Sequence, residues 1–457
     1  TSDLDDCENG SFHGTAVAEA IIDIAPGATL YIATPSSWAD ELATVNWMTE
    51  QGVTIINRSR GSTYQGPGDG TSPLPNNAFT MIDDAVSGGA LFVNSAGNSA
   101  ERTWYGAYSD TDGDGWHNFL GTDEINNFDL VGGKEYIFEL RWEDSWDAAV
   151  RDLDLELYDS SKTRVDRSFN AQNGTTGKIP YEKIKFTAPT SEKYGLAVKH
   201  FSGVLPSWLQ IRVFRGPALE YATSARSITP AAESTNPGLL AVGAAAWFAP
   251  DTIETFSSQG PTMDGRTKPD IVGADRGDSA TYGPAGFSGT SQASPHVAGL
   301  AVLVKQKFPS MTPAQIATYI KDNSLPRGAV PNNIWGFGFA HLPVIEPGPP
   351  SAVTATPGDS KATVTWNSPA NGGSTITGYT VISSPGGNSV AVDGSTLSAV
   401  VTGLSNGTSY TFTVTATNAV GTGDVSAPSA AVTHTGPPDP PTGVTAVGGV
   451  GQATVSW

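Results

Sequence analysis

The chain has 457 residues, and its 52 glycines and 32 prolines show no three-residue period, which excludes a collagen-like fibre. Lysine and arginine total 25 against 45 aspartates and glutamates, so the net charge is -20, and nucleic acids and anionic membrane surfaces are poor partners. The single cysteine, Cys7, excludes an internal disulfide, and no apolar run reaches the roughly 18 residues that a membrane span needs.

The first hundred residues alternate between helical and strand patterns. Apolar residues between His13 and Ile24 recur at helical spacing, and Pro26-Gly27 ends that segment. Short apolar runs bounded by glycine or proline predict buried strands between the helices. Such alternation is typical of a doubly wound α/β fold with a parallel sheet. The predicted order is helix 13–24, strand 29–33, helix 38–49, strand 53–57, helix 76–87 and strand 90–94.

Residues 101–216 have a different pattern. They are rich in aromatic residues, and apolar and polar side chains alternate in segments such as 135–142, 153–158 and 209–214. Alternation with a period of two predicts strands with one buried face, so we expect a β-sandwich inserted into the α/β domain. The α/β domain then occupies residues 1–100 and 217–346, and its second part is predicted to hold helices over 291–308 and 313–323.

A repeat follows a proline-rich linker at 343–350. The segment beginning Pro349-Pro350-Ser351 returns 91 residues later as Pro440-Pro441-Thr442, and each copy leads to a tryptophan. Both copies are rich in threonine, valine and glycine, as expected for all-β domains. We interpret residues 347–435 as one complete β-domain and 436–457 as the start of a second, and we expect the chain to be a fragment of a longer protein.

Three polar residues stand where acyl transfer by a serine would need them. Ser291 lies at the predicted N-terminus of a helix, where free N–H groups and the helix dipole favour negative charge. His13 begins another apolar helix and could take the serine proton. Asn98 directly follows a buried strand, so its amide could donate to an oxyanion together with the backbone N–H of Ser291. The structural alternatives are a helix cap for Ser291 and a turn cap for Asn98.

The sequence around these residues resembles the subtilisin-like serine peptidases. His13-Gly14-Thr15, Ser95-Ala96-Gly97-Asn98 and the run from Gly289 to Gly299 match that family's motifs and occur in family order. The resemblance implies a subtilisin-like fold and hydrolysis of peptide bonds in a protein or peptide substrate, without an organic cofactor. It also implies a triad of Ser291, His13 and an aspartate, with Asn98 in the oxyanion hole.

The aspartate of that triad is the main departure from the family pattern. The resemblance implies an aspartate on a strand well before the histidine, but only 12 residues precede His13. Asp3, Asp5 and Asp6 lie in a segment that reads as the loop leading to the histidine. We therefore expect the catalytic aspartate upstream of this chain, and poor activity without it. The alternative is a non-catalytic adhesion or binding protein on a degenerate peptidase scaffold.

Two segments that follow predicted strands are candidates for binding the substrate backbone. The resemblance implies that Ser59-Arg60-Gly61 and Ser95-Ala96-Gly97 hold an extended peptide as an added strand. Arg60 stands where the family usually carries an apolar residue. Its side chain could simply extend into solvent, or it could form a subsite that favours acidic or polar side chains.

The inserted block contains a candidate calcium loop. Asp110, Asp112 and Asp114 alternate, and Gly115 allows a sharp bend, so one turn could place three carboxylates around a hard cation. Gly121 stands where an EF-hand would need its last glutamate, which excludes an EF-hand. The alternative is a solvated acidic turn. Further carboxylates that could complete the site are Asp123, Glu124, Asp152 and Asp154.

The C-terminal repeat resembles fibronectin type III domains. Trp366, Tyr379 and Tyr410 fall where such sandwiches bury aromatic residues. The resemblance implies a spacer or a binding module, with polysaccharide or extracellular matrix as candidate partners, and it does not imply a catalyst. Because such modules accompany exported hydrolases, we expect a secreted protein.

Overall fold

The computed structural model describes residues 12–214, 216–436 and 440–457. The chain divides into two compact units, Thr1–Leu342 and Pro343–Trp457, which we describe separately. Cys7 and the three N-terminal aspartates Asp3, Asp5 and Asp6 lie outside the described residues.

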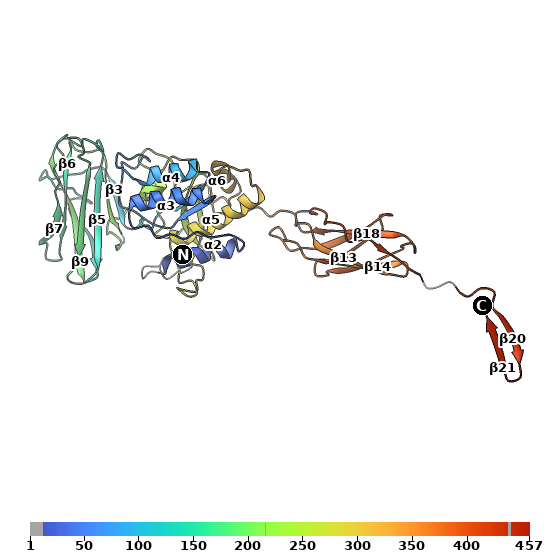
Figure 1. The fold of residues 1–457 in the computed structure, drawn as a ribbon. Helices are drawn as coiled ribbons and strands as arrows, with labels where there is room; N and C mark the ends of the chain where they lie inside the picture. Colours follow the sequence, from blue (N-terminus) through green and yellow to red (C-terminus); the bar gives the residue numbers. More distant parts are fainter. Residues whose placement is uncertain (1–11, 215, 437–439) are drawn as a thin grey trace. The chain divides into compact units, whose positions relative to one another are not determined.

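A parallel sheet forms the centre of the first unit, with helices packed on it (Figure 1). Its strands follow the order β1-β2-β11-β12, and each neighbouring pair is parallel. The strands are β1 (Ile55–Arg58), β2 (Leu91–Ser95), β11 (Leu239–Ala246) and β12 (Ile271–Asp275). The helices are α2 (His13–Ile24), α3 (Trp38–Glu50), α4 (Ala78–Ser87), α5 (Thr290–Lys307) and α6 (Pro313–Asp322), with the 3-10 turn η1 (Pro230–Glu233).

Both faces of this sheet are buried. Leu91 and Val93 of β2 belong to the core formed with α5 and α6, whereas Phe92 between them belongs to the core formed with α3 and α4. Successive side chains of a strand point to opposite faces, so one continuous apolar run supplies both cores. The predicted doubly wound α/β fold is confirmed.

Side-chain caps explain where two of the helices begin. The side chain of Asn77 accepts hydrogen bonds from the backbone N–H groups of Phe79 and Thr80, and α4 follows directly. Thr312 and Gln315 form a capping box before α6. Among the described residues, no helix has the length and apolarity needed to cross a membrane.

The strand predicted over residues 29–33 is absent from the described chain. A strand is defined by its hydrogen-bonded neighbour, and the described part of the sheet pairs no strand with this segment. Residues 28–36 instead line a large cavity together with residues 53–61. The predicted buried strand is therefore wrong in burial as well as in pairing, since Thr29 and Tyr31 are exposed and Leu30, Ile32 and Ala33 are only half-buried.

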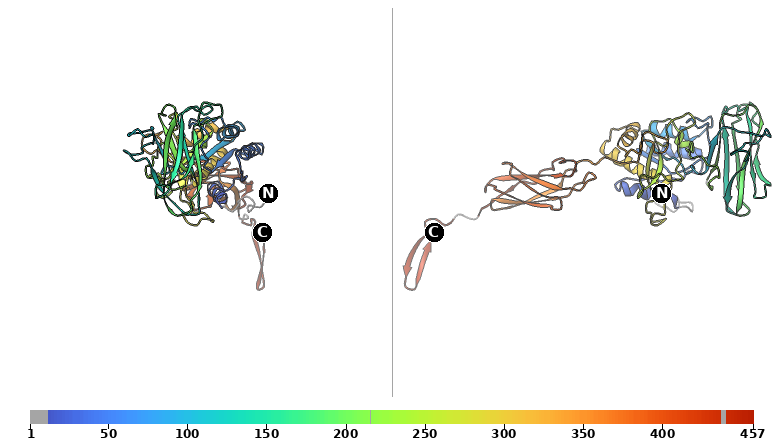
Figure 2. Two further views of the ribbon diagram at one scale, coloured as in Figure 1. Left: turned by 90° about the vertical axis from the view of Figure 1, so that its left-hand side faces the viewer. Right: turned by 180° about the vertical axis from the view of Figure 1, so that it is seen from behind.

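The insert is an antiparallel β-sandwich, as predicted, and its long strands are visible in Figures 1 and 2. Alternate residues such as Phe138 and Leu140 on one sheet and Leu153 and Leu155 on the other fill a shared core. The sheets have the orders β3-β10-β5-β8 and β4-β9-β6-β7. The strands are β3 (Thr103–Gly106), β4 (Asn126–Leu130), β5 (Glu135–Trp142), β6 (Asp152–Tyr158), β7 (Arg164–Ser168), β8 (Tyr181–Thr187), β9 (Glu192–Ser202) and β10 (Leu209–Phe214).

A buried network of charges joins the insert to the α/β domain. Arg141 Nη2 lies 2.8 Å from Glu233 Oε1, and Arg212 Nη2 lies 2.5 Å from Glu139 Oε2. The guanidinium groups of Arg141 and Arg212 stack 4.0 and 4.1 Å from the ring centre of Tyr64. The pair of Arg141 with Glu233 and the stacking on Tyr64 cross from the insert to the α/β domain, whereas the pair of Arg212 with Glu139 lies within the insert. Removing one partner of either buried pair would leave an uncompensated charge.

The second unit is all-β. Trp366, Tyr379 and Tyr410 are buried in one core, and Tyr410 Oη accepts a hydrogen bond from Ser405 N at 3.0 Å. The sheets have the orders β13-β14-β17 and β16-β15-β18-β19, followed by the hairpin β20-β21. The strands are β13 (Ser351–Gly358), β14 (Lys361–Asn367), β15 (Gly378–Ser384), β16 (Ser389–Asp393), β17 (Ser398–Thr402), β18 (Ser409–Thr417), β19 (Val432–Thr433), β20 (Thr445–Gly449) and β21 (Gln452–Ser456).

Candidate active site

Ser291 is the second residue of α5. The turn before it needs glycine, because Gly289 has a φ of 124° and a Cβ there would lie 2.8 Å from Asn98 Nδ2. The hydroxyl of Ser291 donates to the carbonyl oxygen of Ser59 at 3.3 Å. The first N–H groups of a helix have no partner within it, so the backbone N–H of Ser291 is a donor at the same position as the hydroxyl.

Asn98 is held in one orientation by the neighbouring residue of that helix. Its Oδ1 accepts hydrogen bonds from both the backbone N–H and the hydroxyl of Thr290, each at 2.9 Å. A backbone N–H can only donate, so the amide oxygen must face Thr290 and Nδ2 is left to face away from it. This orientation leaves Nδ2 as a donor that does not bond to Thr290, on a residue that lines the same cavity as Ser291.

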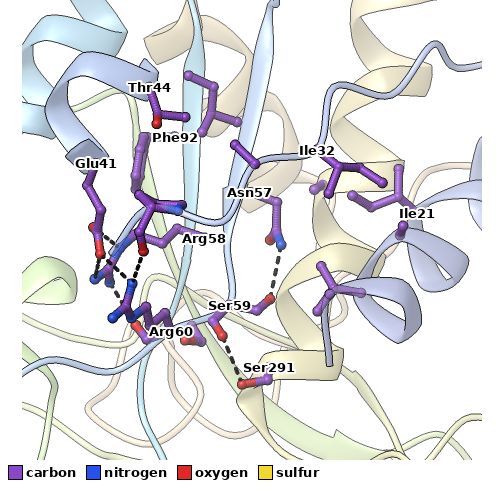
Figure 3. A pocket seen from close by; sticks show the side chains of 18 of the residues that line it. Ile21, Ile32, Glu41, Thr44, Asn57, Arg58, Ser59, Arg60, Phe92 and Ser291 are labelled. Atoms are coloured by element: carbon purple, nitrogen blue, oxygen red, sulfur yellow. Dashed lines mark hydrogen bonds and ion pairs between the residues drawn. The ribbon is translucent and has the colours of Figure 1, made fainter. Parts of the chain in front are cut away.

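His13 reaches the same cavity from a different helix. It is the first residue of α2, and its ring packs edge-on against Phe287 with centroids 5.5 Å apart. A Cβ on Gly299 would lie 2.6 Å from Ile24 Cβ, so the glycine allows α5 to approach α2 closely. His13, Asn98 and Ser291 all line one cavity of about 1360 Å³. Figure 3 shows Ser291 in this cavity, with its hydroxyl directed at Ser59. Three residues far apart in the sequence thus line the same cavity.

The predicted substrate-binding segments lie along this cavity, with one exception. Ser59, Arg60, Gly61, Ser95 and Gly97 contribute to its lining, whereas Ala96 is fully buried and is not part of it. Within 95–97 the lining residues alternate with Ala96, as they do along an extended segment, whereas 59–61 line the cavity at three consecutive positions.

Arg60 is anchored by other residues. Its Nη1 donates to the carbonyl oxygen of Pro35 at 3.0 Å and to Glu41 at 3.1 Å, while the side chain remains 45% exposed. Arg58 binds the same carboxylate, with Nε 2.8 Å from Glu41 Oε2 (Figure 3). One buried glutamate therefore serves two arginines, so the group keeps an excess positive charge.

Asp275 is a buried carboxylate beside the site that the sequence analysis missed. It ends β12, is fully buried, and its Oδ1 accepts a hydrogen bond from Gly289 N at 2.9 Å. Its Oδ2 has no partner among the described residues. Burial, with a smaller contribution from Glu254, raises the pKa of Asp275 from 3.8 to about 6. The sequence feature that could have identified Asp275 is an acidic residue at the end of an apolar strand segment.

We predict that Asp275 makes stability depend on pH. The folded pKa is raised, so ionisation disfavours the folded state increasingly as pH rises from about 4 through about 6. A difference of about two pKa units between the folded and unfolded states corresponds to about 3 kcal/mol of unfolding free energy. Relative to the parent, Asp275→Asn should therefore gain up to about 3 kcal/mol in unfolding free energy between pH 4 and pH 8. Denaturant unfolding at both pH values measures this difference, with the exposed Asp322→Asn as control. An equal offset at both pH values would contradict the prediction.

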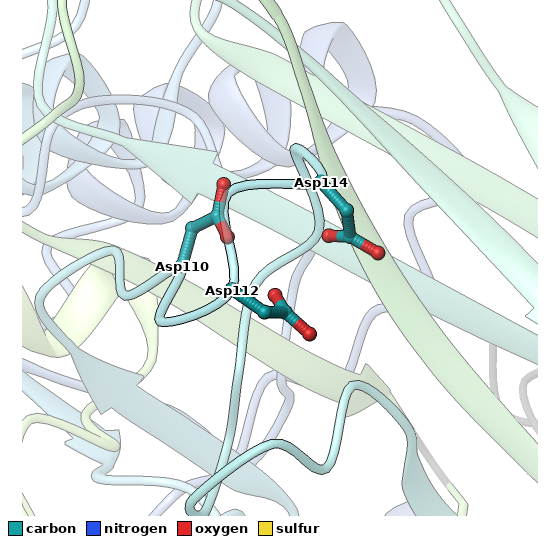
Figure 4. A group of neighbouring side chains, drawn as sticks. All are labelled: Asp110, Asp112 and Asp114. Carbon is teal, nitrogen blue, oxygen red and sulfur yellow. The ribbon is translucent and has the colours of Figure 1, made fainter.

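The insert brings Asp110, Asp112 and Asp114 together, as the candidate calcium loop requires (Figure 4). One oxygen from each lies within 4.8 Å of the others. Glu124 is near enough for all three to raise its pKa, in addition to burial, which is the largest cause. Oxygen ligands alone are the set that Ca²⁺ prefers, so this group fits the ion.

The other carboxylates proposed for this site lie differently. Asp123 is engaged elsewhere, because its Oδ2 accepts a hydrogen bond from the hydroxyl of Tyr221 at 2.6 Å. Asp152 and Asp154 stand on β6 and do not belong to the group of three. Glu124 is therefore the better candidate for a fourth ligand.

A serine, a histidine and an oriented amide around one cavity define the class of site used for serine-dependent acyl transfer. The model of the Subtilase family matches residues 3–338, and that of the Fibronectin type III domain matches residues 348–432. The chain belongs to the subtilase family of serine peptidases. Both predicted family resemblances are confirmed.

Named relatives agree with this assignment. Minor extracellular protease Vpr of Bacillus subtilis is 25% identical over 385 residues, covering 72% of this chain and 44% of Vpr. Serine protease AprX of the same organism is 30% identical over 115 residues, which are 21% of this chain and 26% of AprX. Subtilisin BL of Lederbergia lenta is 44% identical over 62 residues, which are 14% of this chain and 22% of that protein. The chain thus spans less than half the length of each.

A solved structure supports the fold. The Clostridium perfringens CspB protease aligns with a TM-score of 0.50 at 15% sequence identity, covering 67% of this chain and 70% of that chain. At this level of identity the similarity concerns the fold of the chain and not its substrate.

Proposed function

We propose that this protein is a secreted serine endopeptidase in which Ser291 is the nucleophile and His13 the general base. The observation that carries the proposal is the convergence of His13, Asn98 and Ser291 on one cavity, with Asn98 oriented by Thr290. The aspartate of the triad remains the prediction made from the sequence.

The proposed reaction has two halves. Ser291 Oγ attacks the carbonyl carbon of the peptide bond while His13 takes the hydroxyl proton, and the carbonyl oxygen becomes an oxyanion. Asn98 Nδ2 and the N–H of Ser291 stabilise that oxyanion. His13 then gives the proton to the leaving amine, and a water molecule releases the acyl group from Ser291 by the same steps.

The substrate is proposed to bind as an added strand between two backbone segments, 59–61 and 95–97. Ser59 is held in place because its hydroxyl lies 2.8 Å from Ser294 Oγ and accepts from Asn57 Nδ2 at 3.0 Å. At Gly97, φ is 113° and a Cβ would overlap Thr229 Cγ2, so glycine shapes the second segment.

Covalent labelling tests this function directly. An activated serine reacts with a sulfonyl fluoride, which loses fluoride as the sulfonyl group bonds to Oγ. In the full-length protein, mass spectrometry should find one label, on the peptide that contains Ser291. Ser291→Ala should lose the label, and the exposed Ser288→Ala should keep it. Absence of both labelling and peptide hydrolysis would favour the adhesion or binding protein.

Calcium binding by the insert is a separate proposal. Asp110, Asp112 and Asp114 would hold the ion, which would offset the repulsion between their carboxylates. At a calcium concentration about 100-fold above Kd, binding to the folded state alone stabilises it by about 2.7 kcal/mol. We expect millimolar calcium to raise the Tm of the protein and expect no such rise in Asp112→Ala.

A matched control separates specific binding from a general effect of charge. Asp129→Ala removes an exposed aspartate from β4 of the same sandwich and should keep the calcium-induced rise in Tm. Equal shifts in the parent, Asp112→Ala and Asp129→Ala would show that calcium acts elsewhere, leaving the three aspartates as a solvated turn.

The C-terminal unit is proposed to be a spacer or a binding module for polysaccharide or matrix. It forms its own compact unit with its own core, so a polypeptide of residues 347–435 should unfold cooperatively by itself. Deleting these residues should leave turnover of small peptides unchanged within twofold. A large loss of turnover on a small peptide would contradict the spacer role.

A further inference from the structure

The insert contributes directly to the wall of the active-site cavity. Arg102, just before β3, and Phe214, the last residue of β10, both belong to the lining that includes His13 and Ser291. A Cβ on Gly61 would lie 3.2 Å from Phe214 Cε2, so the Phe214 ring stands directly beside this substrate-binding segment. The position of the sandwich therefore shapes the space open to a substrate.

Strand β10 also forms a hydrogen bond with Ser62, the residue that follows Gly61. Arg212 Nη2 donates to the carbonyl oxygen of Ser62 at 2.7 Å. The same guanidinium pairs with Glu139 and lies over the rings of Tyr64 and Phe214. This wall is thus held by buried charges, and side chains on it have defined places.

Arg102 is the residue on this wall with unsatisfied charge. It comes four positions after Asn98, and its backbone N–H closes a turn on Ser99 O at 3.0 Å. Among the described residues, its guanidinium takes part in no hydrogen bond or ion pair, although the side chain is half-buried. Burial lowers the pKa of Arg102, and the nearby charge of Glu101 opposes this only in part.

The charge of the cavity contrasts with that of the whole chain. Its described lining contains three arginines, Arg58, Arg60 and Arg102, and one acidic residue, Glu41. With His13 neutral, the lining carries two net positive charges, whereas the chain carries -20. Glu41 is already shared by Arg58 and Arg60, which leaves Arg102 to meet whatever enters the cavity.

We propose that Arg102 is a specificity residue that selects peptides with a glutamate or aspartate side chain near the scissile bond. A guanidinium offers two parallel N–H donors that match a carboxylate, and half-burial strengthens the attraction by excluding water. The proposal rests on the peptidase function assigned above to Ser291 and names its substrate class.

Paired peptides that differ only by glutamate or glutamine test the cleavage preference. At one subsite the parent protein should cleave the glutamate peptide about 10-fold to 100-fold more efficiently in kcat/KM. Arg102→Gln should bring the ratio of kcat/KM for the glutamate and glutamine peptides to about 1, and Arg102→Glu should favour a lysine peptide. Arg167→Gln, on an exposed part of β7, is the matched control and should retain the preference.

Binding to the Ser291→Ala protein provides a readout that needs no catalysis. Fluorescence anisotropy should show tighter binding of the glutamate peptide, weakened by salt and abolished by adding Arg102→Gln. Equal binding and equal cleavage of the two peptides would overturn the specificity proposal and leave the peptidase function intact. Selective binding without cleavage or labelling in the parent would overturn the peptidase function and leave Arg102 as a carboxylate-binding residue. A glutamate preference that survives Arg102→Gln would overturn the role of Arg102.

Discussion

Replacing Ser291 by alanine should reduce kcat for peptide hydrolysis by about 10⁶-fold, because no other group can form the acyl intermediate. The hydroxyl stands at the start of α5, beside the N–H that would receive the oxyanion, and no backbone change is needed to remove it. KM should change little, since the backbone segments that bind the substrate remain. The measurement is a steady-state assay on a peptide substrate with the full-length protein.

Two variants test whether the loss of activity in Ser291→Ala comes from removing the nucleophile and not from a change in structure. Ser288→Ala removes an exposed hydroxyl three residues earlier and should retain full activity. Ser294→Ala removes the buried partner of Ser59 and should affect KM more than kcat, because it loosens a substrate-binding segment. Activity within tenfold of the parent in Ser291→Ala would remove this residue from the mechanism and with it the proposed reaction.

Replacing Asn98 by alanine should reduce kcat by about 10²–10³-fold, the loss expected for one oxyanion donor. Asn98 Nδ2 matters only once negative charge develops, so KM should stay nearly constant. Asn98→Asp should be at least as damaging, because a carboxylate would accept from Thr290 equally well but would repel the oxyanion. Thermal unfolding of each variant checks that the fold is kept.

Variants of Thr290 distinguish the orientation of the Asn98 amide from its role as a hydrogen-bond donor. Thr290→Ser keeps the hydroxyl bonded to Asn98 Oδ1 and should be nearly as active as the parent. Thr290→Val removes one of the two bonds that orient the amide and also the oxygen that accepts from Gly97 N at 3.2 Å. Thr290→Val should therefore lower kcat more in the parent than in the Asn98→Ala background, where only the contact with Gly97 is lost. Equal losses in both backgrounds would mean that Thr290 acts on something other than Asn98.

Much of the architecture was predictable because it follows from local patterns. Helical spacing between His13 and Ile24 and strand-to-helix alternation predicted the doubly wound domain, and period-two alternation predicted the sandwich. The motifs around His13, Asn98 and Ser291 identified residues that the structure places around one cavity. Short motifs can identify such residues because each motif lies in one turn or at one helix terminus, so its conformation depends mainly on residues that are close in the sequence.

Pairing between distant segments was less predictable. Residues 29–33 have the composition of a buried strand, yet the described chain gives them no ladder partner, because a strand depends on a neighbour that its own sequence does not encode. Glu41, which meets Arg58 and Arg60, was overlooked for the same reason, since the ion pairs span 17 and 19 residues.

The amino-acid sequence alone determined the fold class, the order of the domains and the residues suited to acyl transfer, because periodicity and short motifs are local properties. Only the tertiary structure showed that polar residues on the outer face of the sandwich are buried around Tyr64, and that Arg102 and Phe214 reach the cavity. It also showed Asp275 buried behind Gly289. Burial and unpaired charge depend on which surfaces pack together, and that packing joins segments from 14 residues apart, as for Asp275 and Gly289, to well over a hundred, as for Tyr64 and Arg212.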